Sequence, residues 1–409
     1  MLEVRWRRRA GRIWVSIFVL LVLATIVTAI ILRNNHNVPT SQTKTTVVSK
    51  KPVKVAQPVS IYSNMLFMGN TFWGRYMNDW SMASPLKTAY PFSQLNEFHR
   101  EQYNAWITGL ECPTKAGVTM TSAEMDTLLQ FNCSPDYLPQ AAKWFTAFTL
   151  ANNHTDNQGV DGFNETKANL EKNGIQYFGH YDPRELGDLC DVISMPVTVT
   201  NDNNSTSNGK LPIAMCGYHG VFRIPLPDSV AVMAPYSKLM PVIAMPHMGV
   251  EYVPAPDQIK TDFYRSLIDG GADVVLGDHP HWIQNTESYK GHLIVYSMGN
   301  FMFDQQDTAE VVRSAAIQVV IKTNNDNKDM VKKWLALGQT CETYHDTCLA
   351  DAQKEGLTKL NISFQFGVVG TNDSDKITKP ATVEQLTGIL QRLQWSSTMS
   401  KLQAPYSKL

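Results

Sequence analysis

GADVVLGDHPH, residues 271–281, places two histidines directly after a short apolar run. The run Val274–Leu276 predicts a buried strand, and the loop after it carries His279 and His281 on either side of a proline. Two imidazoles separated by one stiff residue can each reach a metal ion. The stretch therefore favours an α/β fold with a metal site at a strand end, although two incidental surface histidines would give the same letters.

Two further histidine loops follow apolar runs in the same way. Asn153 and His154 stand in one of them, and His247 opens the other. An amide oxygen can ligate a hard metal ion, an imidazole can ligate it or donate a proton, and Glu251 could orient His247 from behind. Taken alone, each loop has a plain alternative: a helix cap for the first and a satisfied core histidine for the second.

Two polar residues end the first two apolar runs of the body. Asn70 ends the first run, and Glu111, a candidate carboxylate ligand, lies just after the second. The carboxyl ends of strands are where open α/β sheets assemble their sites. Five such loops together predict one metal centre, although they would also serve as an ordinary set of turns.

Helical patterns separate these runs, and the alternation of strand and helix predicts an α/β domain over residues 61–322. One helix is expected at 257–271, where Asp257 can cap the amino end and two glycines stop it. Residues 323–409 are expected to form a separate C-terminal extension, with a helix over 382–394.

The first 60 residues have a different character. Residues 1–12 are rich in arginine, which predicts a cytoplasmic tail, and residues 13–32 carry no charge. That uncharged run is about long enough to cross a hydrocarbon layer of roughly 30 Å as one helix. Residues 33–60, rich in Ser, Thr, Lys and Pro, predict a flexible stalk. We expect a single-pass cell-membrane protein with its body outside the cell, a cleaved signal peptide being the alternative.

Charge and cysteine content agree with that placement. The basic amino-terminal part leaves a net acidic body in a chain whose formal charge is −1, and an acidic body is a poor binder of nucleic acid. Six cysteines, an even number, predict disulfides in an exported chain. Their order favours pairs of sequence neighbours, Cys341–Cys348 foremost, with free buried thiols as the alternative.

Together and in this order, the segments resemble the CapA family of poly-γ-glutamate capsule proteins, a branch of the calcineurin-like metallophosphoesterases. The resemblance covers about residues 62–322. The matching segments are Gly69-Asn70 with Arg75, Leu110-Glu111 with Pro113, the stretch from Leu150 through His154, Asp156 and Gly159 to Thr166 and Gly174, the His247-x-Gly-x-Glu-Tyr segment, residues 271–281, and Tyr296–Phe301 with Phe303-Asp304.

The resemblance implies a four-layer α/β sandwich of the metallophosphoesterase type, here preceded by one transmembrane helix, and a part in handling poly-γ-glutamate at the cell surface. It places His154, as proton donor, and Asp156 among the catalytic residues. Glu251 and Asn300 would support the ligands from behind, and the ion would be Mn, Zn or Fe. The implied metal ligands are Asn70, Glu111, Asn153, His247, His279 and His281.

Two departures from the family pattern bear on the metal. Asn70 stands where the family usually has aspartate, and Gly109 stands where it usually has asparagine. Loss of a carboxylate removes negative charge from a cation site, so one ion rather than two is expected.

Two functions remain open at this point. One is an extracytoplasmic metal-dependent hydrolase, and the other is a non-catalytic, membrane-tethered scaffold of a polymer export complex that keeps a degenerate site. The expected partners are the lipid bilayer, capsule synthase or export subunits and an anionic polymer, with no nucleic acid among them.

Overall fold

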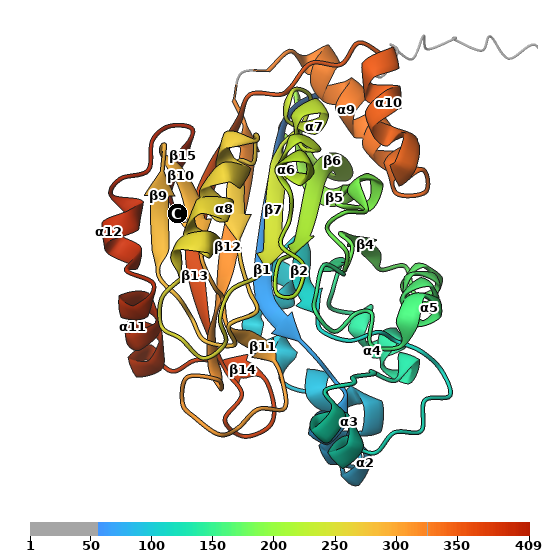
Figure 1. Ribbon diagram of the computed structural model, residues 1–409. Helices are drawn as coiled ribbons and strands as arrows, with labels where there is room; N and C mark the ends of the chain where they lie inside the picture. The colour runs from blue at the N-terminus through green and yellow to red at the C-terminus, as the bar shows by residue number, and fades with distance from the viewer. Residues whose placement is uncertain (1–55, 325) are drawn as a thin grey trace, which may run out of the picture. The chain divides into compact units, whose positions relative to one another are not determined.

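The computed structural model describes residues 56–324 and 326–409 (Figure 1). The predicted basic tail, the predicted transmembrane helix at 13–32 and most of the predicted stalk lie outside these residues. Within them, no helix combines the length and the apolar character that crossing a membrane requires. The part from Ala56 to Leu409 forms one compact unit.

Strand β1 (Pro58–Thr71) is the centre of the sheet because four other strands pair with it. β12 (Arg313–Thr323) and β5 (Cys190–Asn201) run antiparallel to β1. β2 (Ala105–Leu110) and, at the end of β1, β11 (Asn300–Met302) run parallel to it. Segments that are far apart in the sequence therefore meet on one strand.

The two faces of β1 lie against two separate hydrophobic cores. Met65 and Phe67 belong to one core, whereas Leu66 and Met68 belong to the other. Successive side chains of a strand point to opposite faces, so both faces of the sheet are covered here. This explains why these four positions are apolar throughout instead of alternating, and it confirms the predicted α/β class.

Parallel strands extend from this centre in two groups. The strands of the first group are β2, β3 (Ala147–Thr149) and β4 (Gln176–Phe178), and those of the second are β6 (Thr206–His219), β7 (Val242–His247), β8 (Val274–Leu276) and β10 (His292–Val295). The hairpin of β5 and β6 joins the second group to β1, and β9 (Thr286–Tyr289) closes its edge. Both groups end in the polar loops that the sequence singles out.

Two amphipathic helices connect parallel strands. α5 (Gly159–Lys172) leads from β3 to β4, and α8 (Gln258–Asp269) leads from β7 to β8. The backbone N–H of Lys260 donates to the side chain of Asp257 at 2.8 Å, which confirms the predicted cap of α8. The shorter helices of this part are α2 (Arg75–Ala83), α3 (Ser122–Leu128), α4 (Leu138–Ala141), α6 (Pro227–Ala231) and α7 (Ala234–Ser237).

The stretch 323–409, expected as a separate extension, continues the same sheet. β13 (Ile362–Asn372) pairs with the whole length of β12, and β14 (Lys379–Pro380) and β15 (Tyr406–Lys408) pair with β13. Four helices belong to this stretch: α9 (Lys328–Cys341), α10 (His345–Lys354), α11 (Val383–Arg392) and α12 (Trp395–Met399). α11 and α12 lie along the outer side of the sheet, over β13 and β9 (Figure 1).

Three disulfides confirm the predicted pairing of sequence neighbours. They join Cys112 to Cys133, Cys190 to Cys216 and Cys341 to Cys348, and they leave no free cysteine. The second links directly opposite residues of β5 and β6, and the third links α9 to α10. Disulfides of this number are typical of proteins outside the reducing cytoplasm.

Candidate metal centre

The predicted ligands meet at the edge of the sheet where the parallel strands end. Asn70 stands near the end of β1, His247 is the last residue of β7, and Glu111 directly follows β2. The remaining members lie in the loops after β3 and β8 and at the start of β11. The buried members of this set are Asn70, Glu111, Asn153, His247, His279, His281 and Asn300.

Three of these residues present their ligand atoms to one point. The Nε2 atom of His247 lies 2.7 Å from Oδ1 of Asn153 and 3.1 Å from Nδ1 of His279. Zinc binds nitrogen and oxygen at about 2.0–2.2 Å, so atoms about 3 Å apart can share one ion. This group can hold a metal without moving a strand.

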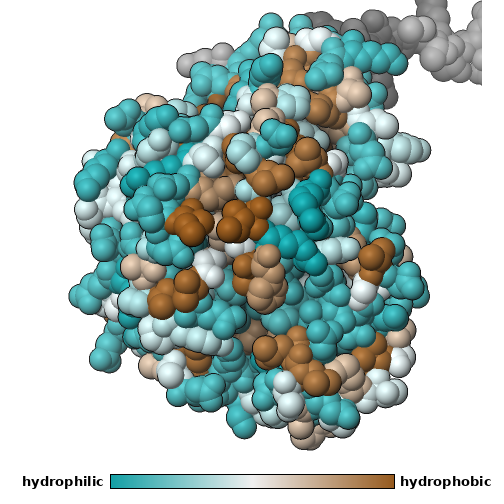
Figure 2. Space-filling view, viewed as in Figure 1, coloured by the Kyte–Doolittle hydropathy of each residue, from teal (hydrophilic) through white to brown (hydrophobic). Residues whose placement is uncertain are grey.

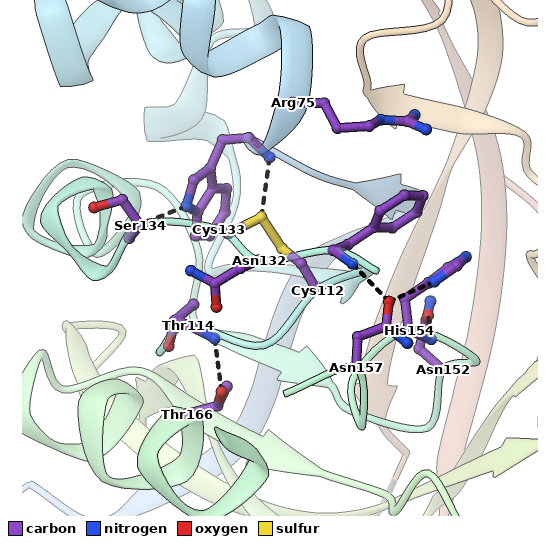
Figure 3. The surroundings of a disulfide bond; sticks show 12 residues. Arg75, Cys112, Thr114, Asn132, Cys133, Ser134, Asn152, His154, Asn157 and Thr166 are labelled. Carbon is purple, nitrogen blue, oxygen red and sulfur yellow. Dashed lines mark hydrogen bonds between the residues drawn. A yellow bond between two sulfur atoms is a disulfide. The ribbon is translucent and has the colours of Figure 1, made fainter. Parts of the chain in front are cut away.

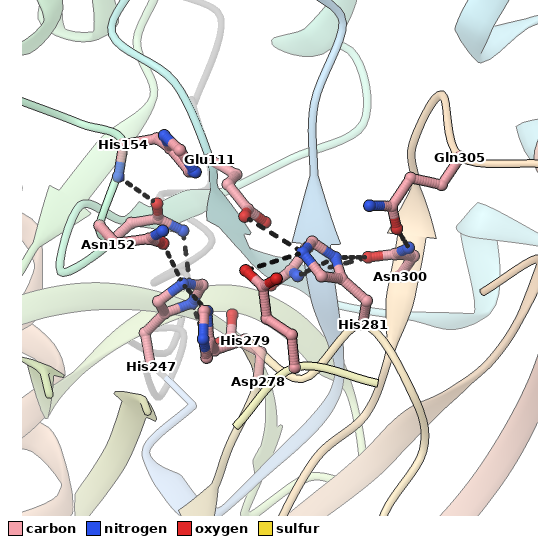
Figure 4. A network of polar contacts seen from close by, with 12 residues as sticks. Glu111, Asn152, His154, His247, Asp278, His279, His281, Asn300 and Gln305 are labelled. Carbon is pink, nitrogen blue, oxygen red and sulfur yellow. Dashed lines mark hydrogen bonds and ion pairs between the residues drawn. The ribbon is translucent and has the colours of Figure 1, made fainter. Parts of the chain in front are cut away.

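A second group surrounds His281 (Figure 4). Its Nδ1 lies 2.8 Å from Oδ1 of Asn300, whose amide nitrogen donates elsewhere, to Gln305 and the carbonyl of Val311. Nδ1 therefore carries the proton, and Nε2 keeps its lone pair. That Nε2 lies 3.8 Å from Oε1 of Glu111 and 3.9 Å from Oε1 of the half-exposed Glu251.

Three buried oxygen atoms around these groups have no hydrogen-bond partner among the described residues. They are Oδ1 of Asn70, Oε2 of Glu111 and Oδ2 of Asp278. An unpaired buried polar atom costs about 1–3 kcal/mol, and more if it is charged. Oxygen atoms left unpaired beside neutral imidazoles form the donor set that a divalent cation requires, so the residues present fit a metal.

Burial controls the protonation of this region. It lowers the pKa of His247 and of His279 well below the ordinary value and lowers the pKa of His281 to about 4. It also raises the pKa of Glu111 well above its usual range, with the charge of Asp278 acting in the same direction. The imidazoles are thus neutral, which is the form that ligates metal, and burial favours the protonated form of Glu111.

The loop after β8 holds its two histidines in an unusual backbone conformation. His279 has a φ of 89° and His281 a φ of 59°, both in the left-handed region that favours glycine. The backbone N–H of Tyr252 donates to the carbonyl of Pro280 at 2.9 Å and fixes the loop. Strain of this kind persists where the surroundings over-determine it and gathers at functional sites.

His154 forms the wall of a pocket of about 310 Å³ that also contains Glu111, Glu251 and His281. Its ring stacks on Phe131 with ring centroids 3.9 Å apart, and its Nδ1 lies 2.9 Å from Oδ1 of Asn157. Burial lowers the pKa of His154 to about 3. The ring is therefore fixed in place, with Nε2 left for a substrate.

Asp156, predicted among the catalytic residues, does not contact His154. Its Oδ2 accepts from Nη2 of Arg223 at 3.1 Å. Asn157 takes the place beside the imidazole instead. The sequence could not distinguish these two neighbours, because the turn after His154 decides which side chain faces back.

The Cys112–Cys133 disulfide connects two segments that shape this pocket (Figure 3). Cys112 follows Glu111, and Cys133 follows the segment that carries Phe131. The backbone N–H of Phe131 donates to Oδ1 of Asn157 at 2.7 Å. The disulfide therefore holds a candidate ligand and the stacking partner of His154 in one rigid unit.

Sequence reasoning missed three buried residues that support the centre. Oδ1 of Asp278 lies 2.8 Å from Nδ1 of His247. Nδ2 of Asn152 lies 3.3 Å from the same Nδ1 atom, and Oδ1 of Asn152 accepts a hydrogen bond from the backbone N–H of His154. Lys260 lies fully buried behind them, where burial lowers its pKa to about 7. The only available signal was that Asp278 and Asn152 each adjoin a predicted ligand.

The rim of the pocket is apolar and exposed. Leu128, Leu129, Phe222 and Tyr252 line the pocket, and Phe222 exposes 75% of its surface. The space-filling view shows apolar patches among hydrophilic surroundings on one face of the molecule (Figure 2). The mouth of the pocket therefore differs in character from its polar floor.

A second cluster of ligand-type atoms lies elsewhere in the described part of the chain. Atoms of Asp191, His345 and Asp346 come within 4.8 Å of one another, beside a pocket of about 230 Å³. His345 Nδ1 lies 2.8 Å from Asp191 Oδ2 and 3.2 Å from Asp346 Oδ1. Because Asp346 is exposed, an ion pair between α10 and β5 accounts for this arrangement.

Comparison with known proteins gives a consistent match. The chain fits the family model described as bacterial capsule synthesis protein PGA_cap over residues 64–189 and 234–305. It is 30% identical over 223 residues to the PGA biosynthesis protein CapA of Bacillus subtilis (strain 168), covering 53% of this chain and 56% of that protein. It is 27% identical over 191 residues to the capsule biosynthesis protein CapA of Bacillus anthracis, covering 44% and 45%.

The chain thus spans about half the length of the curated relatives that it matches. Every predicted ligand falls within the two matched stretches. The solved structure of TT1561 of Thermus thermophilus overlaps 62% of this chain and 93% of that chain, with a TM-score of 0.33 and 10% identity. A likeness this weak carries no argument.

Proposed function

This chain belongs to the PGA_cap family of bacterial capsule synthesis proteins, and on that premise we propose that it takes part in the synthesis or export of a poly-γ-glutamate capsule as a metal-dependent hydrolase. One observation supports the hydrolase function. Oδ1 of Asn153 and Nδ1 of His279 lie 2.7 Å and 3.1 Å from Nε2 of His247, beside a pocket that His154 lines. A scaffold that never bound metal would not need neutral imidazoles and unpaired oxygens at one point.

The residues divide the work as follows. Asn153, His247 and His279 would hold one ion, and Asn70, Glu111 and His281 line the adjoining position. When bound, a divalent cation supplies polarisation of a phosphoryl or amide oxygen and activation of a water.

The protein's own groups orient the substrate and move its proton. His154 holds or moves the proton at Nε2, because its Nδ1 is occupied by Asn157. Asn300 keeps His281 in the tautomer whose Nε2 faces the pocket. The stack on Phe131 prevents the His154 ring from turning away.

We further propose a fold type and a membrane location for this hydrolase. Two cores on the two faces of β1 support a four-layer α/β sandwich of the metallophosphoesterase type. The uncharged run at 13–32 and the arginines before it support a single-pass anchor with the body outside the cell. An anchored body would meet the anionic polymer and the capsule synthase or export subunits at the membrane.

The test compares metal content with hydrolysis on the full-length purified chain. After loading with Mn²⁺ or Zn²⁺, bound metal is measured by mass spectrometry, and cleavage of p-nitrophenyl phosphate, bis-p-nitrophenyl phosphate and γ-glutamyl-p-nitroanilide is followed. His279→Ala combined with His281→Ala should abolish both signals, whereas His345→Ala should change neither. Absence of metal at saturating concentration overturns the proposal, and metal without hydrolysis of any probe favours the scaffold.

A further inference from the structure

Asp278 contacts the metal centre but has no part in the proposed hydrolysis as described above. Its side chain is 2% exposed, and Oδ1 lies 2.8 Å from Nδ1 of His247. A carboxylate in this position accepts a hydrogen bond from Nδ1–H of His247, which leaves the lone pair of Nε2 for a metal. Nε2 is the atom on which Asn153 and His279 converge.

The backbone fixes this contact. Asp278 and His247 form an isolated parallel bridge where β7 and β8 end, and the backbone N–H of Asp278 donates to the carbonyl of Pro246 at 3.2 Å. The carboxylate and the imidazole therefore stand side by side because of the strand register. A side chain placed by register is held more firmly than one on a free loop.

Gly109 provides the space for the second oxygen. A Cβ at this position would lie 2.5 Å from Oδ2 of Asp278, a separation that real Cβ atoms do not show. Oδ2 itself is buried and has no hydrogen-bond partner among the described residues. The absence of a side chain at Gly109 thus leaves the volume that this carboxylate oxygen occupies.

Burial raises the pKa of Asp278 to about 8, and the charge of Lys260 is the leading influence that opposes this rise. Lys260 is fully buried, acts on Asp278 as the leading opposite charge, and donates from Nζ to Oε1 of Gln284 at 3.0 Å. Asp278 is in turn the leading like charge that acts on Glu111. Asn70 contributes no charge.

From this geometry we infer that Asp278 is a positioning residue of the metal centre, whose Oδ1 orients His247 and whose Oδ2 adds negative charge when a cation is bound. Gly109 leaves the space that the Asp278 side chain occupies. This inference rests on the proposed metal-dependent function, since it assigns a role toward the same ion.

The test measures the dissociation constant of Mn²⁺ and of Zn²⁺ for the full-length chain by competition with a chelating dye. Asp278→Asn keeps an acceptor for His247 but removes the charge, and it should weaken binding about 10–100-fold. Gly109→Ala leaves every ligand in place but displaces Oδ2, and it should weaken binding in the same direction. The double variant should bind no more weakly than Asp278→Asn alone, because both changes act through one carboxylate.

Asp191→Asn is the matched control, because it removes a carboxylate that lies 2.8 Å from a histidine outside the centre. It should leave the dissociation constant unchanged. The melting temperature of each metal-free variant separates loss of affinity from loss of fold. If the wild-type chain binds metal and Asp278→Asn binds it equally well, the inference about Asp278 is wrong while the proposed function stands. If the wild-type chain binds none, the proposed function itself has failed.

Discussion

His154 is the residue that most directly separates chemistry from metal binding. Its ring lies flat against Phe131, and none of its hydrogen bonds goes to a predicted ligand. His154→Gln should therefore leave metal content unchanged while lowering hydrolysis of the best probe by about 10²–10⁴-fold, the usual contribution of a positioned proton carrier. Metal analysis and turnover are measured on the same preparation. Full activity in this variant would remove His154 from the mechanism.

Replacing Asn70 by aspartate tests the effect of adding negative charge to the centre. Oδ1 of Asn70 is buried and unpaired, and its Nδ2 lies 3.3 Å from Nδ1 of His281 and 3.3 Å from Oδ1 of Asn300. Asn70→Asp adds a carboxylate to a region where the charges of Glu111 and Asp278 already repel one another. The variant should melt at a lower temperature than wild type in chelator and should bind Mn²⁺ more tightly. Equal metal affinity in the two proteins would contradict a role for charge at this position.

For single residues, the sequence predicted which candidate ligands converge at one edge of the sheet but not which buried residues contact them. His247, His279 and Asn153 were predictable because each directly follows an apolar run, and strand ends meet at one edge. Asp278 and Lys260 were not, because their importance comes from burial and from the direction of one side chain. Asp156 shows the same limit, since the turn after His154 sends it to Arg223 instead.

Among the local elements, the Cys112–Cys133 link should matter more than the Cys341–Cys348 link. The first spans 21 residues and the second spans 7, so chain entropy gives about 3 kcal/mol for the first and about 2 kcal/mol for the second. Replacing each pair by alanines should lower the free energy of unfolding in urea in that order. Only loss of the first pair should also weaken metal binding, because it releases the segments of Glu111 and Phe131.

Helix α8 illustrates how far local patterns reach. Asp257 caps it as the sequence indicates, and Leu267 and Ile268 are buried. Ile259 repeats the same spacing, yet 58% of its surface is exposed. Periodicity identifies the buried face of a helix, but the extent of the neighbouring sheet decides where that face ends.

Across the whole molecule, the pair of His345 and Asp191 joins α10 to β5 and makes stability depend on pH. The close contact with Asp191 raises the pKa of His345 above 6.5, and burial raises the pKa of Asp191. Both groups hold protons more firmly in the folded state, so stability falls as pH rises. The contribution of His345 is complete below about pH 6.5 and disappears as pH passes its folded-state pKa.

Urea unfolding of wild type and His345→Gln checks this expectation. The variant should be less stable than wild type at pH 6 and should match it at pH 9. A difference of the same size at both values would mean that His345 contributes packing and not charge.

The class of the fold followed from the alternation of apolar runs and helical patterns, whereas the arrangement of its last part did not. β13 pairs with all of β12, although nothing in residues 362–372 indicates which strand they join. Long-range pairing depends on register and on the exposed edge of a partner strand, and neither is encoded in a short window. A boundary at residue 322 therefore looked natural in the sequence, while the sheet runs across it.

The position of β1 determines when the centre can form. Tyr62 pairs with Lys322, and Asn70 pairs with Asn300. β1 therefore cannot complete its pairing until β11 and β12, more than 200 residues later in the sequence, are available. Contacts between residues so distant in sequence slow folding. A chain emerging amino end first would keep β1 unpaired on that side, and the ligands scattered, until β11 and β12 had left the ribosome or the export channel. The ion would therefore enter as one of the last events of maturation, after the neighbouring cysteines have had time to find one another.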